Sequence, residues 1–327
     1  MVKVPKGYRS KNVRDTRSVG GSSRGSGGLG GFGRSTSRSS SRGGLGASRP
    51  QGQRGGCGIG FLIMLAVLAF LLFSCFSGGT AGDPLGVDTG ANTTAGGNTA
   101  TDATAPAGSN SESAQEEAAF DLINFVLDDL QEEFWPQEFE EASLTYRDAT
   151  VNVFEQGVST GGCGNATSAV GPFYCPADET AYIDIEYMFL LQDRLGAEGD
   201  FSQAYILAHE VGHHVQTLLG INQALRAAQS GASTTESNAL QVALELQADC
   251  FAGAWAFSFA DRGFLDTGDL EEGIGAASAV GDDAITGSSN QENFTHGSSA
   301  QRVEWFMRGF DEGTDSCGTF DGEMSPG

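Results

Sequence analysis

The stretch Asp200-Phe-Ser-Gln-Ala-Tyr-Ile-Leu-Ala-His-Glu-Val-Gly-His-His-Val-Gln-Thr-Leu-Leu-Gly220 predicts one long helix with a defined beginning and end. Asp200 is a favourable N-cap, Gln203 stands three residues later as in a capping box, and Gly220 is placed to end the helix. Most of the side chains between these residues are apolar. The polar side chains of the helix are therefore expected to be partly enclosed by protein.

Two histidines of this stretch, His209 and His213, stand four residues apart, so their imidazoles lie on one face of the helix about one turn apart. This spacing suits two nitrogen ligands of one tetrahedral Zn²⁺ ion, and Glu210 beside the first ligand is placed to act as a general base. A chance match on a surface helix is the alternative. The apolar helix argues against chance, as does the gathering of three of the four histidines within six residues.

A catalytic zinc ion needs a third protein ligand, and the pattern Glu245-Leu-Gln-Ala-Asp249 supplies a candidate. Glu245 is the predicted ligand. Asp249, one turn later on the same face, is placed to accept the outward N–H of a ligand histidine and so to fix its tautomer. An ordinary solvated acidic pair is the alternative. The apolar residues around both acids favour the metal site, because an unpaired buried carboxylate is costly.

Different roles are expected for the other two histidines. His214 must point about 100° away from His213 around the helix, so a structural role or one behind the ligands is expected. His296 is the only histidine distant in the sequence. It is a candidate catalytic residue that donates a hydrogen bond to the oxyanion of a tetrahedral intermediate. A plain loop histidine near the start of the last helix is the evenly weighted alternative.

The charge of the chain is divided sharply along its length. Residues 1–56 hold 12 of the 18 Lys and Arg residues but only 1 of the 42 acidic residues. Residues 57–76 carry no charge and are long enough to cross about 30 Å of hydrocarbon as a helix. The basic flank predicts a cytoplasmic N-terminus and an acidic domain outside the cytoplasmic membrane. Nucleic acid is not an expected partner, because the acidic domain would repel its phosphates.

Four segments are therefore expected. Residues 1–56 are rich in Gly, Ser and Arg and predict a disordered cytoplasmic tail, with attraction to anionic lipids favoured over RNA binding. Residues 57–76 predict a single transmembrane helix. Residues 77–115 are Gly-, Thr-, Ala- and Asn-rich and predict a flexible linker. Residues 116–327 are long enough for one domain with its own core.

Within that domain, apolar spacing predicts a helix over residues 116–134 that ends at Pro136, and two short strands over residues 149–154 and 180–185. Further helices are predicted over about residues 186–195, 237–261, 269–283 and 299–309. The expected fold class is α+β: a mainly helical, zincin-like metallopeptidase domain with a small sheet. No internal repeat is apparent.

Several segments of the domain resemble one known family, the bacterial "putative neutral zinc metallopeptidases". They are Gly171-Pro-Phe-Tyr-Cys-Pro-Ala-Asp178, Tyr205-Ile-Leu-Ala-His-Glu-Val-Gly-His-His-Val-Gln216, Glu245-Leu-Gln-Ala-Asp-Cys-Phe-Ala-Gly253, Gly281-Asp-Asp283, and Thr295-His-Gly297 with Gln301-Arg302. Together they cover about residues 116–320. The resemblance also implies a Gly-, Arg- and Ser-rich N-terminus followed by one membrane helix, and a metal centre similar to that of the gluzincins.

The six cysteines help to predict the compartment in which the domain lies. Two of them bracket the apolar run, and lipidation of the second, Cys75, is left open. The other four lie in the acidic domain, where an oxidising exterior would preserve disulfides. Four cysteines allow three pairings, of which the favoured one joins Cys163 to Cys175 and Cys250 to Cys317.

The expected function is that of a membrane-anchored, zinc-dependent endopeptidase that hydrolyses peptide bonds of a protein or peptide substrate, with Glu210 as the general base. A non-catalytic, zinc-stabilised binding module outside the cytoplasm is the alternative. That module would need the same metal ligands but not Glu210.

Overall fold

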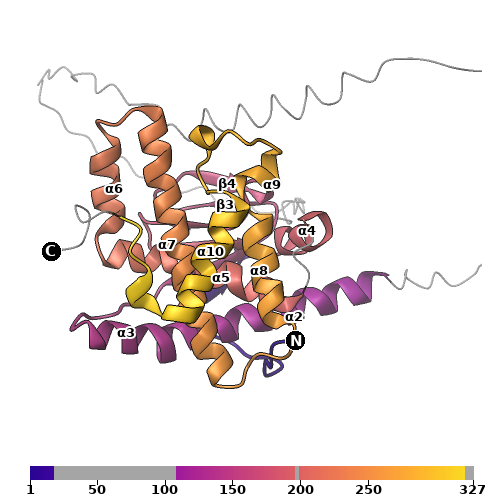
Figure 1. Cartoon of the computed structure of the whole chain (residues 1–327). Helices are drawn as coiled ribbons and strands as arrows, with labels where there is room; N and C mark the ends of the chain where they lie inside the picture. The colour runs from indigo at the N-terminus through magenta and orange to yellow at the C-terminus, as the bar shows by residue number, and fades with distance from the viewer. Residues whose placement is uncertain (18–107, 196–198, 321–327) are drawn as a thin grey trace, which may run out of the picture. The chain divides into compact units, whose positions relative to one another are not determined.

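The computed structural model describes residues 1–17, 108–195 and 199–320, and Figure 1 shows how their helices and strands are arranged. Helices dominate these residues. In chain order the helical segments are α2 (Gly108–Asp128), the π-helical η2 (Asp129–Phe134), α3 (Trp135–Glu141), the short η3 (Ser168–Val170), α4 (Ile185–Leu195), α5 (Asp200–Leu218), α6 (Ile221–Gln229), α7 (Thr234–Asp261), α8 (Asp269–Ala279), α9 (Asp282–Thr286), η4 (Gln291–Asn293), α10 (Ser299–Glu312) and η5 (Thr314–Ser316).

A four-stranded sheet completes the domain, with the strand order β1-β2-β6-β5. β1 and β6 both pair with β2 in parallel, whereas β5 pairs antiparallel with β6. The strands are β1 (Val13–Asp15), β2 (Thr150–Phe154), β5 (Phe173–Cys175) and β6 (Thr180–Asp184), and a separate hairpin joins β3 (Gly157–Ser159) to β4 (Asn165–Thr167). The structure thus confirms a mainly helical α+β domain with a small sheet.

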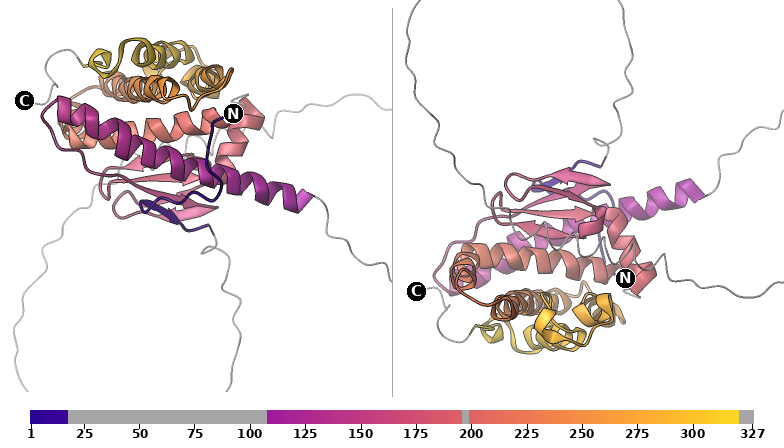
Figure 2. Two further views of the ribbon diagram at one scale, coloured as in Figure 1. Left: turned by 90° about the horizontal axis from the view of Figure 1, so that it is seen from below. Right: turned by 90° about the horizontal axis from the view of Figure 1, so that it is seen from above.

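Helix α5 is the central element of the domain. Figure 2 shows the sheet on one side of α5 and helices α7, α8 and α10 on the other side. Because α5 is covered on both sides, nearly all of its side chains are buried, including the apolar Phe201, Tyr205 and Val211. Gly220, with a positive φ of 76°, ends the helix as predicted. Burial of α5 places its polar face, and therefore both of its ligand histidines, inside the protein.

Glycines allow α7 and α10 to pack backbone against backbone. A Cβ added at Gly253 of α7 would lie 1.9 Å from the carbonyl oxygen of Phe306, and one at Gly309 of α10 would lie 1.8 Å from that of Cys250. The same device acts between α5 and α7, where a Cβ at Gly212 would lie 3.2 Å from Cα of Ala248. These close approaches bring together the helices that carry the predicted ligands.

Two disulfides are present, and they are the favoured pairing. Cys163 bonds to Cys175 next to the sheet, and Cys250 of α7 bonds to Cys317 after α10. The second bond fastens the C-terminal segment to the helix that carries Glu245. The predicted pairing is therefore confirmed.

The prediction that all of residues 1–56 form a disordered tail is wrong for its first part. Residues 1–17 belong to the domain: Val2 is buried, and Val13 to Asp15 form the edge strand β1. The composition of residues 1–56 as a whole concealed this, because the segment joins the core through one strand and many polar contacts instead of an apolar stripe. The remainder of the predicted tail lies outside the described residues.

Three local predictions are also corrected. α2 begins at Gly108, inside the predicted linker. Pro136 does not end the first helix but occupies the first turn of α3, which follows the π-helical η2 directly. Asp200 is the first residue of α5 and not its N-cap, because its carboxylate accepts the N–H of Val2 at 2.8 Å.

The predicted transmembrane helix at residues 57–76 lies outside the described residues. In the part of the chain that the structure describes, no helix combines the length and the apolar character needed to cross a membrane. Membrane association therefore stays a prediction from the sequence.

Replacing Gly253 by alanine is expected to destabilise the domain by about 3 kcal/mol, because the new methyl group overlaps backbone that cannot rotate away. Urea unfolding followed by circular dichroism measures this change. The matched control is Gly275→Ala in α8, where an added Cβ meets nothing within 4 Å and helix propensity predicts a gain of up to about 1 kcal/mol. Equal midpoints for the two variants would contradict the close packing of α7 on α10.

Candidate metal centre

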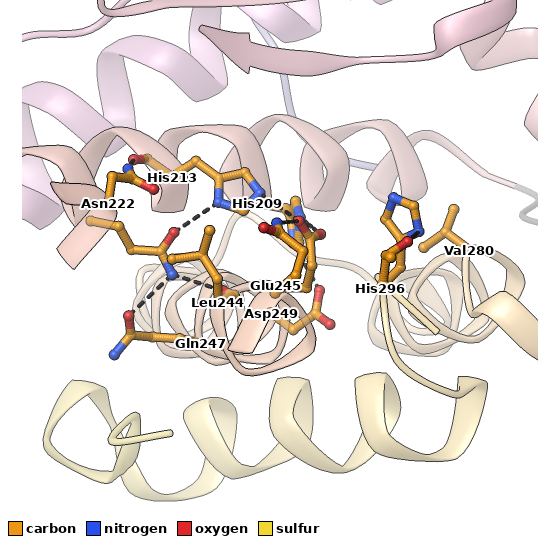
Figure 3. Close-up of polar contacts among 12 residues, drawn as sticks. His209, His213, Asn222, Leu244, Glu245, Gln247, Asp249, Val280 and His296 are labelled. Carbon is orange, nitrogen blue, oxygen red and sulfur yellow. Dashed lines mark hydrogen bonds and ion pairs between the residues drawn. The ribbon is translucent and has the colours of Figure 1, made fainter. Parts of the chain in front are cut away.

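Two helices bring the three predicted ligands to one point. His209 and His213 project from α5, and Glu245 projects from α7 to meet them, as Figure 3 shows. Nε2 of His209 lies 3.3 Å from Oε2 of Glu245, and Nε2 of His213 lies 3.6 Å from Oε1 of the same carboxylate. One donor atom from each residue lies within 4.8 Å of the others. This is the arrangement that a metal ion held by two imidazoles and one carboxylate requires.

Hydrogen bonds on the far side of each imidazole leave Nε2 free for the shared point. Nδ1 of His209 donates to Oδ1 of Asp249 at 2.8 Å, because an ionised carboxylate can only accept. Nδ1 of His213 donates to Oε1 of Gln216 at 2.8 Å. The amide nitrogen of Gln216 donates to the carbonyl oxygen of Leu244 at 2.7 Å, which fixes the orientation of that amide. Both rings are thereby held in the tautomer that binds metal through Nε2.

Asp249 is itself held by two residues that the sequence analysis did not single out as site residues. Arg302 of α10 donates from Nε to Oδ2 and from Nη2 to Oδ1, both at 2.8 Å. Tyr205 of α5 donates its hydroxyl to Oδ1 at 2.5 Å. Burial opposes ionisation of Asp249, but the charges of Arg302 and His209 outweigh it and hold the pKa of Asp249 below its usual value. The carboxylate behind His209 is therefore ionised and fully satisfied.

The electrostatics of the centre favour a cation at the point where the ligands meet. Burial opposes the charge on Glu245, but the two histidines hold its pKa well below the ordinary value. Burial also disfavours a charged His209, yet Asp249 and Glu245 raise the pKa of this histidine to about 9. The buried carboxylate of Glu245 therefore requires positive charge here, and a divalent metal ion meets that requirement.

Glu210 has the environment expected of a general base beside such a metal ion. The side chain is buried, and its Oε2 has no hydrogen-bond partner among the described residues. Burial raises the pKa of Glu210 above its usual value. A buried carboxylate oxygen without a partner beside three converging ligands fits a site built for a metal ion and a water molecule.

His214 points away from the centre, as expected, and has a structural role. Its Nδ1 lies 3.0 Å from the hydroxyl of Tyr174 on β5, and its Nε2 donates to the carbonyl oxygen of Arg147 at 2.7 Å. Burial lowers the pKa of His214, which keeps the ring neutral. The imidazole thus joins α5 to the sheet side of the domain.

His296 does not join the ligand group. Figure 3 shows it beside the centre on the loop before α10, and its side chain is 50% exposed. Nδ1 of His296 lies 3.2 Å from Oδ1 of Asp282, whose Oδ2 accepts the N–H groups of Thr295, His296 and Gly297. Burial opposes a charge on His296, but Asp282 and Glu245 raise its pKa. Asp282 therefore orients this ring, with Nε2 left for another partner.

Two contacts of the centre were not predicted from the sequence, one local and one between distant residues. Gln216 stands three residues after His213, on the same side of α5, and that spacing was a usable signal. Nothing local to Arg302 indicates that its guanidinium is buried against Asp249. Only the packing of α10 on α7 brings these two residues together.

Comparisons with known proteins identify one family and several relatives. The family described as "Putative neutral zinc metallopeptidase" matches residues 3–320. The chain is 50% identical over 194 residues to "Uncharacterized protein YpfJ" of Escherichia coli K12, a match that covers 58% of this chain and 67% of that protein. It is 43% identical over 186 residues to "Uncharacterized protein Mb2605" of Mycobacterium bovis, covering 52% of this chain and 61% of that protein. No solved structure matches. The chain belongs to the family described as "Putative neutral zinc metallopeptidase".

Proposed function

We propose that the domain is a zinc-dependent endopeptidase in which His209, His213 and Glu245 hold one Zn²⁺ ion and Glu210 is the general base. The observation that carries this proposal is the buried Oε2 of Glu210, which has no partner among the described residues and belongs to the residue that follows His209 in α5. Two nitrogen ligands and one carboxylate are the donor set of many catalytic zinc sites, which keep a further position open.

Different residues of the chain have different roles in peptide hydrolysis. When bound, the zinc ion would supply Lewis acidity, which makes a water molecule easier to deprotonate and a carbonyl group easier to attack. Glu210 accepts a proton from the attacking water as the water oxygen bonds to the carbonyl carbon. Glu210 then passes that proton to the amine nitrogen as the carbon–nitrogen bond breaks. Asp249 and Gln216 keep the two ligand imidazoles in position throughout.

His296 is the proposed partner of the substrate oxygen. Asp282 accepts a hydrogen bond from Nδ1 of His296, and the raised pKa of the ring favours its charged form, in which Nε2–H donates to the negative oxygen that develops in the transition state. The hydrogen bonds from the loop backbone to Asp282 hold the carboxylate in place before substrate binds.

A non-catalytic, zinc-stabilised binding module is the alternative function. Such a module needs the three ligands but gains nothing from Glu210. Burying a carboxylate whose second oxygen is unpartnered is costly, and a purely structural site would have no reason to bear that cost. The buried Glu210 therefore favours the enzyme.

The two disulfides support a location outside the cytoplasm, because disulfides persist in oxidising compartments. The substrate proposed there is a protein or peptide. A search with a library of peptides, followed by mass spectrometry of the new termini with and without a chelator, would define what is cut.

Glu210→Gln is expected to leave zinc binding intact and to lower peptide hydrolysis by about 10²- to 10⁴-fold, because the amide cannot accept the proton of water. Zinc content by atomic absorption and cleavage of the best library peptide measure the two effects. Glu271→Gln, an exposed change on α8, is the control and should behave like the unchanged protein. Full activity in the zinc-loaded Glu210→Gln protein would refute the mechanism.

Asp249→Asn is expected to weaken zinc binding by about 10- to 100-fold, because the amide no longer gives His209 a charged acceptor and leaves Arg302 unpaired. Competition with a chromogenic chelator measures the dissociation constant. Glu312→Gln, at the exposed end of α10, is the matched control. An unchanged dissociation constant would mean that Asp249 does not support His209 as a ligand.

His296→Ala is expected to lower kcat by about 10²- to 10³-fold with little change in KM, because the lost hydrogen bond forms only with the transition state. Zinc content should not change. Ser289→Ala, an exposed change in the same loop region, is the control. A rise in KM at constant kcat would instead assign His296 to substrate binding.

A further inference from the structure

The N-terminal segment, residues 1–17, is fastened to the domain at both of its ends. At the beginning, the α-ammonium group of Met1 lies 2.6 Å from Oδ1 of Asp269, and the N–H of Val2 donates to Asp200. At the end, β1 pairs in parallel with β2, with Arg14 opposite Asn152. The side chain of Val2 is only 5% exposed. The segment is therefore part of the fold and not an appendage.

Between these ends the segment follows the acidic helix α2. The N–H of Gly7 donates to Oδ2 of Asp121 at 2.7 Å, and the N–H of Ser10 donates to Oδ1 of Asn124 at 2.9 Å. Arg9 forms ion pairs with both Asp121 and Glu117. Main-chain groups and charged side chains of the segment thus have partners in the domain. A segment that packs into a folded domain needs such partners for its polar groups.

Met1 contacts an acidic cluster at the starts of α5 and α8. Carboxylate oxygens of Asp200, Asp269 and Glu272 lie within 4.8 Å of one another. The hydrogen bond from the Met1 ammonium to Asp269 raises the pKa of that ammonium, which keeps it charged. The Met1 ammonium thus adds a positive charge beside Asp269, one of these three carboxylates.

The basic residues of the N-terminal segment form ion pairs with the domain. Lys3 pairs with Asp266 at 3.2 Å, and Lys11 lies 3.8 Å from Asp148. Their charges, with those of Met1 and Arg9, complement carboxylates of the acidic domain. From the sequence alone, the same charges predict a cytoplasmic tail beside anionic lipids. One set of lysines and arginines cannot be on the cytoplasmic side and in contact with an exterior domain.

We infer that residues 1–17 and the domain formed by residues 108–320 lie on the same side of the membrane. Strand β1 bonds directly to β2, whereas a single crossing between them would separate them by about 30 Å of hydrocarbon. This inference replaces the expectation of a cytoplasmic N-terminus and an exterior domain, because the paired strands β1 and β2 share one side.

Labelling of single cysteines in the full chain tests this inference. With Cys57 and Cys75 changed to serine, Arg14→Cys in β1 and Ser230→Cys in the domain are made separately; both native residues are exposed. A membrane-impermeant maleimide is added to intact cells, with lysed cells as the reactivity control. Both positions should be labelled in intact cells, or neither. Labelling of one position but not the other would overturn the inference.

A cross-link tests the strand pairing in the same background. The double variant Arg14→Cys with Asn152→Cys should form a disulfide between the paired strands, seen as a mobility shift that a reductant removes. The two single variants are the matched controls and should not shift. No shift in the double variant, with both thiols reactive to maleimide, would overturn the pairing. Neither readout depends on zinc or on peptide hydrolysis, so failure here would leave the proposed function standing.

Discussion

The buried ion pair between Arg302 and Asp249 is the interaction on which the candidate metal centre depends. It joins α10 to α7, and through His209 it joins both to α5. A fully buried carboxylate is tolerable only if its charge and its hydrogen bonds are satisfied, and removing one partner of such a pair costs about 3–5 kcal/mol. The orientation of the first ligand is therefore coupled to the stability of the helical layer behind it.

Close helix packing makes that ion pair possible. An arginine that reaches a carboxylate on a neighbouring helix through two short hydrogen bonds needs the two backbones to be close and fixed. Gly253 and Gly309 provide this between α7 and α10, while Gly212 lets α5 approach α7. The disulfide from Cys250 to Cys317 then fastens the end of the chain to α7, one residue away from Asp249.

Charge compensation governs the N-terminal segment as well as the centre. The domain is strongly acidic, and its own first residues carry part of the balancing charge onto α2 and onto the starts of α5 and α8. Asp200 shows the link between the two regions. It begins the helix that carries His209 and His213, and its carboxylate accepts the N–H of Val2. The N-terminus thus contributes to the support of the helix that carries the ligands.

The sequence by itself determined the local parts of this protein: the helix with His209, Glu210 and His213, the acids Glu245 and Asp249, and the strands that became β2 and β6. Residues at fixed spacing on one helix share a face whatever surrounds them, so such features can be read locally. Only the tertiary structure decided that Arg302 and Tyr205 hold Asp249, that His296 stands outside the ligand group, and that residues 1–17 form an edge strand. These contacts join residues far apart in the chain, and their energy comes from partner surfaces that a local pattern does not encode.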